Sequence, residues 1–252
     1  MTIKKTDTKL MRYMGSKRRI ADEILPIMLG SSDSKVFVDA FCGGCSVIER
    51  VPPSYRRIAI DANRYLIAMW QALQDGVRFK EHITRDEYIA ARDCLNDNGD
   101  SRYSDAEIGF IGFMASRNGI FFNGYTGHDV VGKDGKHRDY VAEYIANIKK
   151  DVPLLQGVEF AHASYDESDY PDGCIIYCDP PYKGVRQYRG THKFDFDNFY
   201  IWCMEMKLKG HKVFVSEYDM PSGFTCIWQK EITNSLAMTK TTRPTEKLFT
   251  IE

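Results

Sequence analysis

The sequence lacks any long hydrophobic run, and none of its apolar stretches approaches the roughly 18 residues that a membrane-spanning helix needs. Residues 1–10 are polar and carry lysines, so the apolar core of a secretory signal is also missing. Apolar residues make up 43% and charged residues 27% of the 252 positions, as in ordinary globular proteins. We therefore expect a cytoplasmic protein without membrane contact, either one large α/β domain or such a domain with an insertion.

The sequence also lacks a paired set of cysteines. Its 7 cysteines are an odd number scattered along the chain, which is typical of reduced thiols rather than of a disulfide framework. Cys42 and Cys45 have the spacing of a metal or redox pair, but no second CxxC and no HxxxH follows at the distance that a zinc site requires. We expect neither a disulfide nor a metal site.

An excess of positive charge is absent as well, because 34 basic and 35 acidic side chains leave a formal net charge of −1. A nucleic-acid-binding surface must then come from local clusters of basic residues. The clusters comprise Lys4, Lys5, Lys9, Arg12, Lys17, Arg18, Arg19, Lys183, Arg186, Arg189, Lys193, Lys240, Arg243 and Lys247. Composition alone leaves open whether they bind DNA or form ordinary solvated surface.

Short β-branched or aromatic runs alternate with segments of helical periodicity through most of the chain. The expected strands are 36–40, 58–61, 158–162, 174–179, 213–216 and 248–251, and the expected helices between them are 18–29, 63–73 and 198–209. Alternation of this kind predicts an α/β fold with a mainly parallel sheet and helices on both of its faces.

Residues 79–150 interrupt this alternation. Helical patterns recur at 86–95, 105–117 and 140–149 without a clear buried strand. Residues 119–127 and 132–138 combine turn formers with aromatic and basic residues, which favours an exposed loop or hairpin. We therefore predict a catalytic domain of residues 1–78 and 151–252, interrupted by a mostly helical subdomain of residues 79–150.

A glycine-rich turn follows the first expected strand, whose polar end is Asp39. Gly43 and Gly44 permit a ligand to approach the backbone closely, as at the first strand–helix junction of nucleotide-binding sheets. The turn is neither a Walker loop, G-x-x-x-x-G-K-[ST], nor the dinucleotide fingerprint, G-x-G-x-x-G. We expect it to open onto a helix, and a plain tight turn is the alternative interpretation.

The second expected strand ends at Asp61, where a carboxylate can accept hydrogen bonds from both hydroxyls of an adenosine ribose. Together with Asp39 it places carboxylates at two successive strand ends, a pattern that indicates a nucleoside cofactor. Asp61 also stands just before the helix that Asn63 leads, so helix capping is the competing interpretation.

The most informative feature is Asp179-Pro180-Pro181-Tyr182, directly after a buried strand. Two consecutive prolines fix a rigid loop, and the residue before each proline is kept out of the helical region. The Asp179 carboxylate and the Pro180 carbonyl are thereby held as fixed acceptors beside an aromatic ring. They suit a flat heterocycle that stacks on Tyr182 and donates both hydrogens of an amino group. A strand that merely ends in a proline turn is the alternative.

These motifs resemble those of the Dam-type (class alpha) adenine-N6 DNA methyltransferases, and the resemblance covers most of the chain. R-Y-M-G-S-K of residues 12–17 is similar to the family's N-terminal cofactor motif, and D-A-F-C-G of residues 39–43 to its glycine loop. D-A-N of residues 61–63 and D-P-P-Y of residues 179–182 resemble its acidic and catalytic motifs. Residues 216–219 and 246–249 look like its late strands. Cys45 stands where the family has its second glycine.

The resemblance implies a Rossmann-like methyltransferase fold with an inserted target-recognition subdomain. It also implies S-adenosylmethionine as the cofactor and double-stranded DNA as the partner, and we expect a monomer or a weak dimer. The implied catalytic residues are Asp179, Pro180, Pro181 and Tyr182, and the implied cofactor-binding residues are Tyr13, Lys17, Asp39, Phe41, Gly43, Asp61 and Asp179.

The DNA-binding candidates come from the insert and from the segment after the catalytic loop. They are Arg117, Asn118, Asn123, Tyr125, Lys133, Lys136, Arg138, Lys183, Arg186 and Arg189. Residues 116–124 resemble the family's recognition hairpin only loosely, because the arginine expected after its second Asn-Gly is absent. The target sequence therefore does not carry over.

The expected reaction moves a methyl group from S-adenosylmethionine to N6 of an adenine flipped out of the duplex. Acceptors for both amino hydrogens favour a pyramidal nitrogen, so catalysis depends on positioning and electrostatics. The alternatives are methylation of cytosine N4 or of RNA adenine, a non-catalytic DNA-binding relative, and an NAD oxidoreductase. The first loop aspartate favours adenine, the intact loop favours an enzyme, and the missing dinucleotide fingerprint disfavours NAD.

Overall fold

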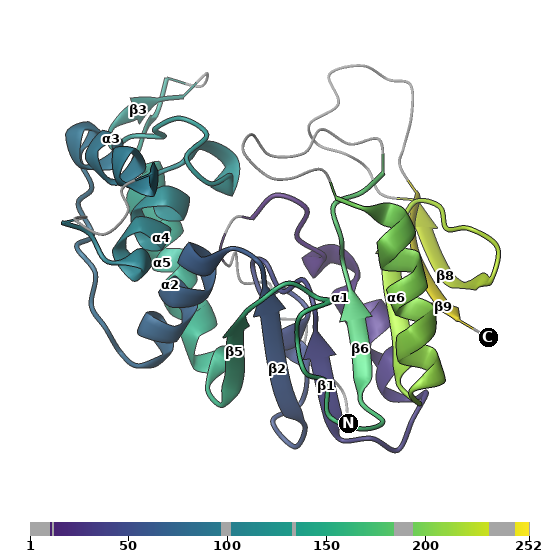
Figure 1. Ribbon diagram of the computed structural model, residues 1–252. Coiled ribbons are helices and arrows are strands. Elements are labelled where there is room, and N and C mark those ends of the chain that lie inside the picture. The colour runs from purple at the N-terminus through teal and green to yellow at the C-terminus, as the bar shows by residue number, and fades with distance from the viewer. Residues whose placement is uncertain are drawn as a thin grey trace.

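A computed structural model describes residues 11, 13–96, 102–132, 135–183, 194–231 and 245–251. Within them a seven-stranded sheet forms the centre of the molecule, in the order β5-β2-β1-β6-β7-β9-β8 (Figure 1). The strands are β1 (Val36–Asp39), β2 (Arg56–Asp61), β5 (Val158–His162), β6 (Ile175–Cys178), β7 (Lys212–Glu217), β8 (Phe224–Glu231) and β9 (Thr245–Ile251). The first five strands of this order are parallel, whereas β9 is antiparallel to both neighbours.

Successive residues of the central strands point to opposite faces of the sheet, and each face has its own hydrophobic core. Phe37 and Ile175 belong to one cluster, whereas the residues after them, Val38 and Ile176, belong to the other. The helices are α1 (Arg18–Leu29), α2 (Arg64–Gln74) and α5 (Tyr140–Asp151) on the first face, and α6 (Phe196–Leu208) on the second. The predicted α/β class, with a mainly parallel sheet and helices on both faces, is confirmed.

Local sequence signals start several helices. The Asn63 side chain accepts hydrogen bonds from the backbone N–H groups of Tyr65 and Leu66 and so caps α2. Helices α3 (Arg85–Asp93) and α4 (Asp105–Met114) each begin with a capping box. In this motif a hydroxyl residue and a glutamate three positions later each accept the backbone N–H of the other. These signals explain why α2, α3 and α4 begin close to their expected positions.

Helices α3 and α4 and a small hairpin gather beside the β5 edge of the sheet (Figure 1). The hairpin pairs β3 (Val130–Val131) with β4 (His137–Arg138). Helix α4 packs closely on α2, because a Cβ added to Gly109 would lie 2.0 Å from the carbonyl oxygen of Tyr65. Ile148 of α5 belongs to the same core cluster as α1 and α2. The boundaries of the inserted subdomain, at residues 79 and 150, stay a prediction.

Two features differ from the sequence-based expectation. Strand β8 was not predicted, because its side chains lie mostly exposed at the edge of the sheet and a register shift between Cys226 and Trp228 breaks the alternation. The glycine turn does not open onto an α-helix. It leads only to a 3-10 turn, η1 (Ile48–Arg50), because Val51 precedes a proline and adopts an extended conformation.

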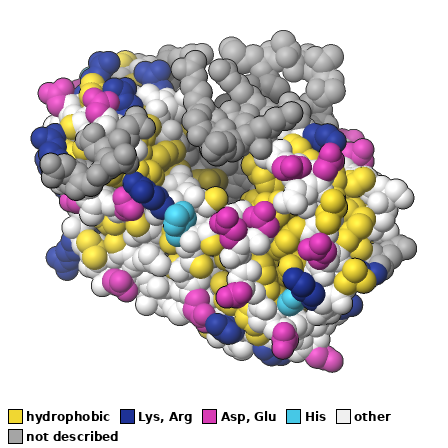
Figure 2. All heavy atoms as spheres, viewed as in Figure 1, with side chains coloured by type: hydrophobic (Ala, Val, Ile, Leu, Met, Phe, Trp, Pro, Cys, Tyr) yellow, Lys and Arg dark blue, Asp and Glu magenta, His cyan; other side chains and the backbone are white. Residues whose placement is uncertain are grey.

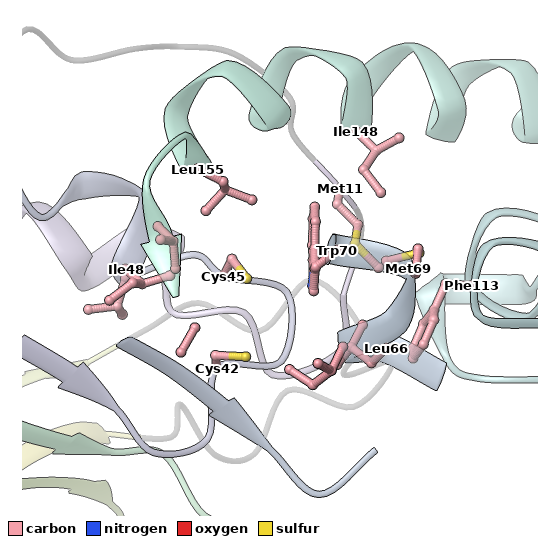
Figure 3. Packing of buried hydrophobic residues seen from close by; sticks show 14 of the residues in the cluster. Met11, Cys42, Cys45, Ile48, Leu66, Met69, Trp70, Phe113, Ile148 and Leu155 are labelled. Atoms are coloured by element: carbon pink, nitrogen blue, oxygen red, sulfur yellow. The ribbon is translucent and has the colours of Figure 1, made fainter. Parts of the chain in front are cut away.

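Trp70 of α2 fixes the glycine turn from the core side. Its indole N–H donates to the carbonyl oxygen of Gly43 at 3.1 Å, and its side chain is 1% exposed. Figure 3 shows Trp70 beside Cys45 of the turn and Met11 of the N-terminal segment. The turn, α2 and the first described residue therefore share one core.

Candidate active site

Three aspartates meet where the carboxyl ends of neighbouring strands reach one edge of the sheet. Asp39 and Asp61 are the last residues of β1 and β2, and Asp179 directly follows β6, which pairs with β1. Burial holds the pKa of Asp39 well above its usual range, and the charges of Asp179 and Asp61 raise it further. This edge of the sheet is thus rich in closely spaced carboxyl groups.

Lys17 supplies the counter-charge to Asp179. Its Nζ lies 2.8 Å from Asp179 Oδ1 and donates to the carbonyl oxygen of Gly15 at 2.9 Å. The Lys17 side chain is only 7% exposed. Burial raises the pKa of Asp179 to about 6, while the positive charge of Lys17 acts to lower it. The N-terminal motif and the D-P-P-Y loop therefore form one site.

Three groups hold the ring of Tyr182. The Lys17 ammonium lies 4.6 Å from the ring centroid, and the Tyr182 hydroxyl donates to Oε2 of Glu246 at 2.7 Å. The ring of Tyr218 packs against it with a centroid separation of 4.6 Å and an interplanar angle of 85°. Before it in the loop, Pro180 is buried and Pro181 is exposed.

Glu217 holds the chain that leaves the catalytic loop. Its carboxylate accepts the backbone N–H of Lys183 at 3.0 Å and that of Tyr218 at 2.7 Å, and its side chain is buried. A hollow of about 330 Å³ opens beside these groups and is lined by Lys183, Tyr200, Glu217, Tyr218, Asp219, Met220 and Pro221. Neither Glu217 nor Glu246 is among the predicted site residues, and the resemblance of their segments to late family strands is the one signal that pointed to them.

Tyr13 lies against the glycine turn. A Cβ on Gly43 would be 2.7 Å from Cε1 of Tyr13, and a Cβ on Gly44 would be 2.6 Å from its Cβ, so both positions need glycine for this approach. Cys45 has a φ of 58°, in the left-handed region that favours glycine. Cys45, which stands where the resemblance places the family's second glycine, therefore adopts a backbone conformation that favours glycine.

Asp61 joins the end of β2 to the glycine turn. Its Oδ2 accepts the backbone N–H of Gly43 at 3.0 Å, and its Oδ1 accepts that of Asn63 at 2.8 Å. Asn63, and not Asp61, supplies the side chain that caps α2. Asp61 thus orders the loop around the predicted cofactor site.

Phe41, the remaining cofactor candidate, belongs to an aromatic cluster on the α6 face. Its ring stacks on Tyr165 with a centroid separation of 5.3 Å and an interplanar angle of 27°. Phe194 and Phe199 meet its ring edge-on, at 5.9 and 5.8 Å. The turn after β1 therefore has Tyr13 on one side and this apolar wall on the other.

A closed loop carries four of the DNA-binding candidates. Ser116 and Tyr125 form a β-bridge across its base, and the N–H of Arg117 donates to the carbonyl oxygen of Gly124 at 2.9 Å. The hydroxyl of Tyr88 on α3 lies 3.0 Å from Ser116 Oγ and accepts the N–H of Gly124 at 3.0 Å. These bonds make the loop a fixed projection of the insert.

The candidates on this loop differ in their surroundings. Arg117, Asn118 and Asn123 are exposed, and Asn118 has a φ of 60°, which suits the left-handed conformation that asparagine tolerates. Tyr125 is half-buried, and its hydroxyl donates to the carbonyl oxygen of Ile83 at 2.6 Å. The first three side chains therefore project from the loop, whereas Tyr125 is anchored to the chain that leads into α3.

The other basic candidates lie beside the hairpin and the catalytic loop. Arg138 is exposed in β4, Lys136 is exposed just before that strand, and Lys183 is exposed directly after the D-P-P-Y loop. Figure 2 shows Lys and Arg side chains over the part of the molecule that carries α3 and the hairpin, at the upper left. Three further predicted residues, Lys133, Arg186 and Arg189, lie outside the described residues.

A metal site and a membrane-spanning helix are both absent from the part of the chain that the structure describes. No group of three or more His, Cys, Asp or Glu side chains there is arranged to hold a metal ion. No helix there has the length and apolar character to cross a membrane. All seven cysteines are free thiols.

A family model described as D12 class N6 adenine-specific DNA methyltransferase matches residues 13–236. The match spans the N-terminal motif, the glycine turn and the D-P-P-Y loop, so the predicted resemblance is confirmed. No curated protein matches the chain.

Proposed function

We propose that this chain, which belongs to the D12 class N6 adenine-specific DNA methyltransferase family, takes its methyl group from S-adenosylmethionine and acts on a flipped-out adenine. The family match shows that the chain is an adenine-specific DNA methyltransferase. The observation that carries the proposal is the ion pair between Lys17 and Asp179. It joins the N-terminal motif to the catalytic loop at the sheet edge where ligands of parallel α/β folds bind.

The charges at this edge fit the cofactor. S-adenosylmethionine, when bound, supplies a methyl group on a positively charged sulfur, and its amino group carries a second positive charge. Asp39 Oδ1 is buried and accepts no hydrogen bond within the described residues, so it can accept one from a cationic donor. A bound cation would also favour the ionised form of Asp39. The same carboxylates would repel the pyrophosphate of NAD.

The cofactor-binding residues form two walls in this proposal. Tyr13 and the turn at Gly43 make one wall, because the ring packs directly on the turn. Phe41 makes the second wall with its apolar surface. Asp61 keeps the turn in place and offers its remaining lone pairs to ribose hydroxyls. Lys17 bridges from this pocket to the catalytic loop.

The adenine is held by the D-P-P-Y loop in this proposal. The Asp179 carboxylate and the Pro180 carbonyl accept the two amino hydrogens, so that the nitrogen lone pair is directed at the methyl group. A pKa of about 6 keeps Asp179 largely ionised at neutral pH, as an acceptor must be. Tyr182 stacks on the base and, with these hydrogen bonds, offsets the roughly few kcal/mol of unstacking.

The insert and the segment after the loop contact DNA in this proposal. The exposed side chains Arg117, Asn118 and Asn123 project from the closed loop, and Lys183 stands beside the hollow next to the catalytic loop. Basic side chains at these places can contact phosphates on either side of the flipped base. Affinity for duplex DNA should therefore fall as the salt concentration rises.

One experiment tests the proposal. The protein is incubated with labelled S-adenosylmethionine and unmethylated duplex DNA, and the digested nucleosides are separated. We expect label only in N6-methyl-2′-deoxyadenosine, its loss in Asp179→Ala, and full activity in Asp33→Ala, an exposed control aspartate. Thermal unfolding checks that both variants are folded. Label only in deoxycytidine, label in no nucleoside, or label that appears only when RNA replaces the DNA would overturn the proposal.

A further inference from the structure

Strand β9 reaches the catalytic edge of the sheet because of its direction. It is antiparallel to β7, so its first residues lie where β7 ends, and Lys247 pairs with Glu217. Glu246, the residue before Lys247, is thereby placed next to the D-P-P-Y loop. Its Oε2 accepts the Tyr182 hydroxyl at 2.7 Å. Glu246 also lies beyond residues 13–236, the range of the family match.

The two glutamates at this edge hold different parts of the loop. Glu217 accepts backbone N–H groups, so it fixes the path of the chain. Glu246 accepts the hydroxyl of Tyr182 and therefore acts on a side chain. Removing the Glu246 carboxylate should leave the loop backbone in place and free the ring.

The ring of Tyr182 needs such a bond because the prolines do not control it. Pro180 and Pro181 restrict the backbone, whereas the side-chain torsions of Tyr182 stay free to rotate. The Lys17 ammonium and the Tyr218 ring contact the Tyr182 ring without a directional bond. A hydrogen bond from a hydroxyl to a carboxylate is short, directional and roughly twice as strong as a neutral one. Glu246 is thus the group that sets the orientation of the ring.

We propose that Glu246 is a positioning residue for methyl transfer, which orients the Tyr182 ring against the target adenine. The inference rests on the proposed function, because it requires a base that stacks on Tyr182. Glu246 touches neither the base nor the cofactor in this account. Loss of the Glu246 carboxylate should therefore lower the rate of methyl transfer and leave cofactor affinity unchanged. The loss of rate should depend on the presence of the Tyr182 hydroxyl.

Four variants test the inference: Glu246→Ala, Glu246→Gln, Tyr182→Phe and the double variant Glu246→Ala/Tyr182→Phe. The single-turnover rate of N6-methyladenine formation should fall about tenfold in Glu246→Ala, which corresponds to about 1.4 kcal/mol. Glu246→Gln should stay within about threefold of the wild type, because its amide oxygen still accepts the hydroxyl. The double variant should be no slower than Tyr182→Phe.

Further measurements separate positioning from a loss of structure. The dissociation constant of S-adenosylmethionine and the unfolding temperature should match the wild type in all four variants. Glu231→Ala, which removes an exposed glutamate from neighbouring β8, should keep full activity. A wild-type rate in Glu246→Ala, or additive losses in the double variant, would overturn the inference while the proposed function stands. Absence of N6-methyladenine with the wild-type protein would instead refute the proposed function.

Discussion

Lys17 and Asp179 form a largely buried ion pair, with 2.8 Å between Nζ and Oδ1. The two residues come from opposite ends of the matched motifs, one before α1 and the other after β6. The same ammonium lies over the ring of Tyr182. One side chain from the N-terminal motif therefore controls both the charge and the surroundings of the catalytic loop.

Replacing Lys17 with methionine should move the acidic limb of the pH–rate profile to higher pH. The pKa of Asp179 is about 6, and the charge of Lys17 lowers it, so removing that charge raises it. Since the ionised carboxylate accepts the amino hydrogens, the rate falls as pH decreases through this pKa. Single-turnover rates between about pH 5 and 9 measure the limb. Lys35→Met, an exposed control, should leave it unchanged, and a Lys17→Met profile that overlays the wild type would contradict the assignment.

Gly44→Ala should weaken the binding of S-adenosylmethionine by about tenfold without unfolding the protein. The added Cβ would lie 2.6 Å from the Cβ of Tyr13, so the tyrosine must leave the glycine turn. Calorimetric titration gives the dissociation constant. In a Tyr13→Gly background the clashing Cβ is gone, and Gly44→Ala should then have no further effect. An equal loss in both backgrounds would show that Tyr13 does not mediate it.

Arg117→Ala should weaken binding to duplex DNA and reduce the slope of log affinity against log salt by about 1, as for the loss of one phosphate contact. The side chain is exposed on a loop whose ends are bridged, so its removal leaves the loop closed. Fluorescence anisotropy at several salt concentrations measures the slope. Arg56→Ala removes an exposed arginine that pairs with Glu159 on β5, and it serves as the control. Equal slopes for Arg117→Ala and the wild type would place Arg117 outside the DNA contact.

Asp151→Asn should stabilise the protein near pH 8 and have little effect near pH 4. Asp151 is fully buried, and burial raises its pKa from 3.8 to about 7. The stability that its protonated form contributes is present below about pH 4 and lost as pH rises to 7, because the unfolded carboxyl ionises first. Asparagine keeps an acceptor for the N–H of Met11, which Asp151 Oδ2 binds at 2.7 Å.

The expected rise in unfolding temperature for Asp151→Asn is about 5 °C or more at pH 8. Calorimetry of both proteins between about pH 4 and 8 gives the difference at each pH. Asp22→Asn serves as the control, because Asp22 lies on the exposed side of α1. Its unfolding temperature should show no gain that grows with pH. A gain that is constant with pH would mean that ionisation of Asp151 does not limit stability.

The sequence predicted the elements whose signals are local. Helix α1 forms over the predicted residues because its apolar positions recur with helical spacing, and β6 ends at Cys178, just before Asp179, because two prolines follow. Strand β8 has no such signal, since its exposed edge position removes the alternation of apolar and polar residues. Its place depends on pairing with β9, which the sequence does not display.

The residues of the site likewise divide into those with a local sequence signal and those without one. The D-P-P-Y loop and the glycine turn carry motifs in consecutive residues, so they were recognisable in the sequence. Glu217 and Glu246 reach the loop across the sheet, from positions 34 and 64 residues later than Lys183 and Tyr182 respectively. Isolated glutamates resemble ordinary surface residues until strand order is known. Cys45 likewise required the backbone to show that its position keeps the conformation of a glycine.

The antiparallel strand β9 has a consequence for biosynthesis. It lies between β7 and β8 in the sheet, although β8 precedes it in the chain. Tyr182 gains its hydrogen-bond partner only when a residue 64 positions further on has been translated, which takes roughly 3–13 s at typical rates. A nascent chain that already displays the D-P-P-Y loop therefore still has an untethered tyrosine. The Tyr182 ring can take its fixed orientation only after β9 has been synthesised and Glu246 accepts its hydroxyl.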